Sequence, residues 1–127
     1  MDNSKDNTFT IGEESAGIIQ VADDVVSSIA ALAVLEVDGV SRLTGNISND
    51  LVAKLGKRNL SKALRVIFEE DKVRVDVTIE AKFGYNLIKI SNEVQEKVKS
   101  SLMTMTGLEC TSVNVKISGI DMDGENV

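Results

Sequence analysis

The fold of this chain is decided by residues 73–120, which read VRVDVTIEAKFGYNLIKISNEVQEKVKSSLMTMTGLECTSVNVKISGI. The stretch begins and ends with alternating apolar and polar residues, which is typical of a strand with one buried face. Between them, apolar residues recur at helical spacing from Leu87 to Thr106, and Gly107 follows as a helix stop. We therefore predict a strand at 73–81, a helix at 87–106 and a second strand at 111–120. The helix positions expected to face inward are Ile90, Val94, Val98, Leu102 and Met105.

Shorter patterns predict the elements upstream. A strand at 63–68 forms a hairpin with 73–81 through the acidic turn 69–72, and further short strands are expected at 17–21 and 40–43. Asp23 and Asp24 open a helix that runs to about Leu35, and at its start they cap it or oppose its dipole. Its expected apolar face holds Val25, Ile29 and Ala33, with Val26, Ala30 and Leu32 beside them. Two helical turns are expected at 49–55. This order predicts an α+β fold, a two-layer sandwich whose mostly antiparallel sheet has its helices packed on one face.

The domain boundaries follow from composition. A chain of 127 residues suits one compact core. Residues 1–16 are polar and acidic, so we expect a mobile N-terminal leader, followed by a single domain at 17–120 and an acidic C-terminal tail at 121–127.

The composition argues against catalysis. The chain has no His and one Cys, which excludes His-dependent triads and multi-Cys metal sites, and Cys110 opens an apolar strand where a buried thiol is expected. The acidic pairs at 23–24 and 69–71 fit a helix start and a turn better than acid/base chemistry. We therefore expect no enzyme activity, catalytic residue, metal or cofactor. The longest apolar stretch, 25–35, is too short to span a bilayer and the N-terminus does not resemble a secretory signal, so we expect a cytoplasmic protein.

Several separated blocks carry a family resemblance: Phe83-Gly84-Tyr85, Met105-Thr106-Gly107-Leu108 and 113–120, with Gly17-Ile18-Ile19 and 36–40 upstream. Together they resemble the alkaline shock protein (Asp/Gls) family of envelope stress response proteins over about residues 17–122. The stretch 39–56 is similar to the branch associated with lipid-synthesis genes in Gram-positive bacteria. The resemblance implies a cytoplasmic, non-enzymatic scaffold or interaction protein that self-associates or docks near the inner face of the membrane and supports cell envelope homeostasis.

The strongest local charge anomaly is a basic segment at 54–65, which holds no acidic residue in a chain of net charge -6. It is either a solvated loop or a surface that binds an anion or a partner. The opposing group could be lipid phosphate, a nucleic acid or the acidic ends of this chain. Direct contact with anionic lipid would be weak, so stable attachment at the membrane is expected to need a second contact, with a membrane-anchored or envelope-related protein partner. The candidate residues are Lys54, Lys57, Arg58, Lys62 and Arg65.

Two further alternatives stay open on the sequence. A small RNA- or phosphate-binding domain could use the basic segment, although a pI of about 4.6 and few aromatic residues argue against nucleic acid. Tyr85, the only tyrosine, either supports the connection between strand and helix or lies exposed as an interface residue.

Overall fold

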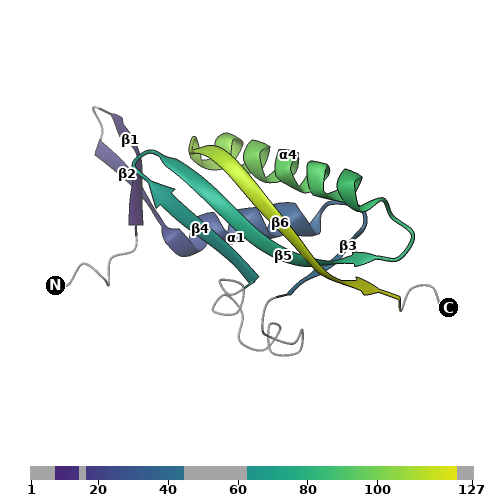
Figure 1. The fold of residues 1–127 in the computed structure, drawn as a ribbon. Coiled ribbons are helices and arrows are strands. Elements are labelled where there is room, and N and C mark those ends of the chain that lie inside the picture. Colours follow the sequence, from purple (N-terminus) through teal and green to yellow (C-terminus); the bar gives the residue numbers. More distant parts are fainter. Residues whose placement is uncertain (1–7, 15–16, 45–62, 123–127) are drawn as a thin grey trace.

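A computed structural model of the protein describes residues 8–14, 17–44 and 63–122 (Figure 1). Its elements are β1 (Thr8–Glu14), β2 (Gly17–Ala22), α1 (Asp23–Leu35), β3 (Val40–Leu43), β4 (Leu64–Glu69), β5 (Lys72–Lys82), α4 (Leu87–Thr106) and β6 (Glu109–Asp121). The predicted helical turns at 49–55 lie outside the described residues.

Strand β5 is the centre of the main sheet. Strand β6 runs parallel to it along its whole length, from the pair Lys72–Glu109 to the pair Lys82–Asp121. The other strands pair antiparallel with β5, β4 along 72–77 and β3 along 79–81. Because a strand has only two edges, β3 and β4 lie end to end along the edge opposite β6. The parallel pair β5–β6 needs a crossover connection, which α4 supplies.

Both helices cover one face of this sheet (Figure 1). The inward residues of β5 are fully or almost fully buried, whereas the residues between them, from Arg74 to Glu80, are partly exposed on the other face. This alternation confirms the predicted two-layer α+β sandwich. The buried side chains of β5 are Val73, Val75, Val77, Ile79 and Ala81.

The buried face of α4 differs from the prediction at its last position. Ile90, Val94, Val98 and Leu102 are buried as expected, but Met105 is 65% exposed and Thr106 is buried in its place. The spacing of four residues thus continues to the helix end. Thr106 can take this position because its hydroxyl donates to the Leu102 carbonyl at 2.7 Å and accepts from the Leu108 amide at 3.1 Å.

The buried face of α1 agrees with the expected one at Val26, Ile29, Ala30 and Ala33, which are all buried. Val25 and Leu32 are exposed instead, and Val34 is buried in addition. Asp23 and Asp24 lie in the first turn, where they oppose the helix dipole, and the N-cap is Ala22 without a side-chain hydrogen bond. Among the two roles expected of these carboxylates, capping was therefore wrong.

The N-terminal segment holds a strand that the sequence analysis did not anticipate. Within residues 1–16, for which we expected a leader without structure, Thr8–Glu14 form β1 and pair antiparallel with β2 in a separate two-stranded sheet. The reason lies in the run Thr8-Phe9-Thr10-Ile11, whose β-branched and aromatic residues favour strands. The prediction was based on the polar and acidic composition of residues 1–16 as a whole, and this average does not reflect the strand preference of residues 8–11.

The N-cap of α4 gives a first testable prediction. Asn86 Oδ1 accepts a hydrogen bond from the Lys89 amide at 2.9 Å and so caps the helix. Asn86→Ala is expected to lower the free energy of unfolding by about 1 kcal/mol, because that amide loses its acceptor. Urea denaturation followed by far-UV circular dichroism measures the change. Asn86→Asp keeps the acceptor and should remain close to the wild type, and an equal loss in both variants would contradict the capping role.

Candidate functional site

The sheet face opposite the helices is polar and open. Most of its charged side chains are paired with one another. Arg74 contacts Glu69 at 3.0 Å, and Arg42 contacts Glu80 at 3.2 Å and Asp121 at 3.4 Å. Ser41 Oγ also donates to Asp121 Oδ2. These contacts connect neighbouring strands, so the charged side chains that form them already have partners within the sheet.

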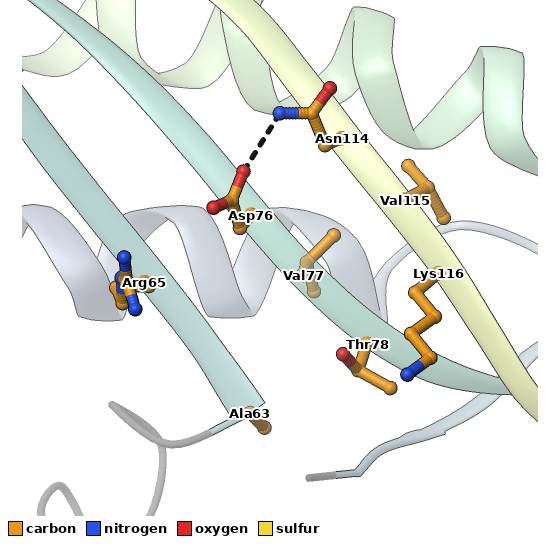
Figure 2. Close-up of a pocket in the computed structure, with 8 residues that line it drawn as sticks. All are labelled: Ala63, Arg65, Asp76, Val77, Thr78, Asn114, Val115 and Lys116. Atoms are coloured by element: carbon orange, nitrogen blue, oxygen red, sulfur yellow. Dashed lines mark hydrogen bonds between the residues drawn. The ribbon is translucent and has the colours of Figure 1, made fainter.

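A hollow of about 420 Å³ lies in the middle of this open face, and we call it the sheet-face hollow (Figure 2). Three strands contribute to it, with Arg65 from β4, Thr78 from β5 and Lys116 from β6. Asn114 donates from its side-chain amide to Asp76 Oδ1 at 2.8 Å across the β5–β6 boundary. Its complete lining is Ala63, Arg65, Asp76, Val77, Thr78, Asn114, Val115 and Lys116.

The two cations of the hollow differ from Arg42 and Arg74 on the same face. Arg65 and Lys116 are exposed, and neither forms an ion pair with any residue that the structure describes. Figure 2 shows the Lys116 side chain running from β6 over β5 toward Thr78. The hollow thus combines two positive charges that have no ion-pair partner in the described part of the chain, a hydroxyl, and one carboxylate that is already hydrogen-bonded.

The basic segment proposed from the sequence is only partly described. Arg65 lies in β4 and reaches the sheet-face hollow, whereas Lys54, Lys57, Arg58 and Lys62 lie outside the described residues. Anion or partner binding by these residues stays a prediction.

A second surface is apolar and lies at the end of the domain where β5 leads into α4. The Phe83 amide donates to the Asp121 carbonyl at 3.1 Å, which brings the β5–α4 connection beside the end of β6 (Figure 1). Ile88, in the first turn of α4, is 74% exposed. We call this surface the apolar end patch, and its exposed members are Phe83, Tyr85, Leu87, Ile88, Ile120 and Met122.

Tyr85 is half exposed and packs against the fold with the rest of its ring. Its side chain is 47% exposed, yet the ring lies so close to Gly39 that a Cβ at Gly39 would be 2.7 Å from Tyr85 Cδ2. A small hollow of about 140 Å³ beside the ring is lined by Asp38, Asn86, Lys89, Ile90 and Glu93. One face of Tyr85 therefore supports the fold and the other is available for contact. Its use as an interface residue stays a prediction.

Cys110 is buried, as the sequence predicted. Burial disfavours the thiolate and so raises the pKa of the Cys110 thiol above the ordinary value. A thiol with a raised pKa is a poor nucleophile at neutral pH. Cys110 therefore belongs to the core.

Among the described residues, no group of three His, Cys, Asp or Glu side chains is arranged to hold a metal ion. Within the same part of the chain, no helix is both long enough and apolar enough to cross a bilayer.

Comparison with known proteins identifies the family. A model of the Asp23 family, described as having a cell envelope-related function, matches residues 12–122. This chain belongs to the Asp23 family. The family name is unrelated to residue Asp23 of this chain. The match confirms the resemblance to the alkaline shock proteins, while the narrower branch assignment stays a prediction.

Similar proteins occur in Bacillus subtilis and Streptococcus pyogenes. The chain is 35% identical over 107 residues to the uncharacterized protein YqhY of Bacillus subtilis, covering 84% of this chain and 79% of that protein. It is 30% identical over 112 residues to the uncharacterized protein Spy1614 of Streptococcus pyogenes, covering 87% and 93%. A stress response regulator gls24 homolog of Streptococcus pyogenes is 29% identical over 118 residues, covering 92% of this chain and 64% of that protein. None of these descriptions names an enzymatic activity.

Among solved structures, a manganese form of the MamM CTD matches with a TM-score of 0.47 and 14% identity. The match covers 76% of this chain and 98% of that chain, a likeness too weak to carry an argument.

Sequence reasoning singled out Arg65 and Tyr85 but missed their neighbours. Lys116 occupies an outward position in the predicted strand at 111–120, and nothing in the alternation of that strand shows which residue of another strand lies beside it. For Ile88 the sequence did contain a signal of an exposed apolar position. Ile88 is an isoleucine two positions before the buried Ile90, and therefore on a different face of the helix.

Proposed function

We propose that this member of the Asp23 family is a non-enzymatic interaction module that works as a scaffold in cell envelope homeostasis and stress response. It self-associates and docks on a membrane-anchored or envelope-related protein partner at the cytoplasmic face of the membrane. The observation that carries this proposal is the apolar end patch, because several large exposed apolar side chains at one end of a small domain mark an interaction surface.

The composition of the patch supports a contact between proteins. Phe83, Tyr85 and Ile88 supply two aromatic rings and the most exposed large apolar side chain of the described residues. Aromatic side chains are enriched at the energetic centres of interfaces, and surrounding residues that exclude water strengthen them. Leu87, Ile120 and Met122 extend the apolar surface around them.

Ile88→Glu tests the proposal because it adds a charge to the patch without harming the helix. An acidic residue in the first turn opposes the dipole of α4 favourably, and the Ile88 side chain is mostly in solvent. We expect self-association to weaken by about tenfold or more, the effect of losing a central interface contact. Light scattering coupled to size-exclusion chromatography over a concentration series measures it. In fractionated cells, the wild-type chain should be recovered with membranes and the variant should not.

The matched control is Ser100→Glu, which adds the same charge to an exposed position twelve residues further along α4. It should associate and fractionate like the wild type. A wild-type chain that stays monomeric at high concentration would contradict self-association through the patch, and equal behaviour of both variants would show that added charge alone is responsible.

A further inference from the structure

We propose that the sheet-face hollow binds the phosphate group of a small phosphorylated molecule, with Arg65, Thr78 and Lys116 as the phosphate ligands. This inference is independent of the proposed scaffold role, because it uses no residue of the apolar end patch.

The first argument is the arrangement of the three donors. Arg65, Thr78 and Lys116 lie on three adjacent strands, with Thr78 in the middle. Neighbouring strands are about 4.8 Å apart, and Arg65 lies opposite Asp76 whereas Lys116 lies opposite Thr78, two residues further along β5. The two outer residues therefore begin about 12 Å from each other, a span that their long side chains can cover together above β5. A tetrahedral phosphate offers one oxygen to each of the three donors, whereas a planar carboxylate offers only two oxygens.

The second argument is that neither Arg65 nor Lys116 forms an ion pair within residues 8–14, 17–44 and 63–122. Arg74 and Arg42, on the same face, are each held by carboxylates at 3.0–3.4 Å. Arg65 lies directly opposite Asp76 in the β4–β5 register, yet these two side chains form no ion pair. Asp76 is instead held by Asn114 at 2.8 Å. A guanidinium without a carboxylate partner keeps its paired donors for a phosphate.

The charge and size of the hollow fit an organic phosphate. Arg65, Lys116 and Asp76 together leave one net positive charge, which attracts an anion. The volume of about 420 Å³ lies within the range of about 300–1,000 Å³ that is typical of small-molecule sites and leaves room for an organic group beside the phosphate. The second oxygen of Asp76 offers an acceptor to a hydroxyl of that group.

The test is a titration of the isotopically labelled full-length chain with phenyl phosphate, followed by NMR. We expect saturable shifts at the amides of residues 65, 78 and 116, with a millimolar or tighter Kd. Arg65→Gln and Lys116→Gln should each weaken binding by about tenfold or more, since each removes a charge-assisted hydrogen bond. Thr78→Val should weaken it by a smaller factor.

Two controls make the test decisive. Arg74→Gln removes the same charge from the same face but from a paired side chain, and it should change the Kd by less than about twofold. Ile88→Glu should also leave binding unchanged, which separates this site from the proposed scaffold role. Absence of saturable shifts, equal weakening by Arg74→Gln, or binding of benzoate as tight as that of phenyl phosphate would each overturn the proposal.

Discussion

Gly39→Ala is expected to lower the free energy of unfolding by about 3 kcal/mol, because two effects act at this position. The backbone has a φ of +96°, which residues with a Cβ rarely adopt. The added methyl would also lie 2.7 Å from Tyr85 Cδ2 and 2.8 Å from Ile90 Cδ1. Ile90 is buried in the core and cannot move without disturbing α4. Urea denaturation followed by far-UV circular dichroism measures the loss, which should appear in the midpoint with the slope unchanged.

Gly84→Ala is the matched control that isolates the cost of placing a residue with a Cβ at a positive φ. Its φ of +97° is almost the same, but an added Cβ would meet no atom within 4 Å. The expected loss is about 1 kcal/mol, from the conformational preference alone. The difference between the two variants measures how closely Gly39 is packed against Tyr85 and Ile90. If both variants lose the same stability, that packing contributes nothing.

Ile79→Ala is expected to cost about 4 kcal/mol, the upper part of the range for truncating a buried isoleucine. The side chain is fully buried, and its register partners are Leu43 on β3 and Ile117 on β6. Its removal therefore leaves a cavity where three strands meet under the helices. The same urea denaturation experiment measures the change in the free energy of unfolding.

Two variants calibrate the Ile79 result. Ile79→Val removes a single methylene and should cost about 1 kcal/mol. Ile67→Ala makes the same truncation on the open sheet face, where the side chain is only partly buried, and should cost less than about 2 kcal/mol. A loss at Ile67 as large as that at Ile79 would contradict the assignment of the core to the helix-covered face.

The sequence could predict the elements of the sheet because their patterns are local. The alternation from Val73 to Ala81 defines both the strand and its buried face, and the four-residue spacing from Ile90 to Leu102 defines the helix that covers it. The predictions of buried residues were wrong where burial depends on neighbours that are close in space but not in the local pattern. Met105 is the more apolar residue, but Thr106 is buried because its hydroxyl satisfies two backbone groups at the helix end.

The candidate surfaces were less predictable because they are assembled across strands. Arg65 and Lys116 are 51 positions apart in the sequence, and only the shared partner β5 brings them to one hollow. No periodicity within one strand contains that information. The family resemblance could be recognised from separated blocks, since those blocks are the turns and strand ends that the fold requires.

Strands β3 and β4 share one edge of β5, and this arrangement bears on how long the connection between them can be. Leu43 ends β3 opposite Ile79, and Leu64 begins β4 opposite Val77, so the chain leaves the sheet and returns to it within two residues of β5. The two attachment points are thus about 7 Å apart along the strand direction. The described edge of β5 opposite β6 is therefore one strand interrupted between Leu43 and Leu64. The entropic cost of connecting two such points grows only slowly with the length of the connection, so the sheet itself constrains that length only weakly.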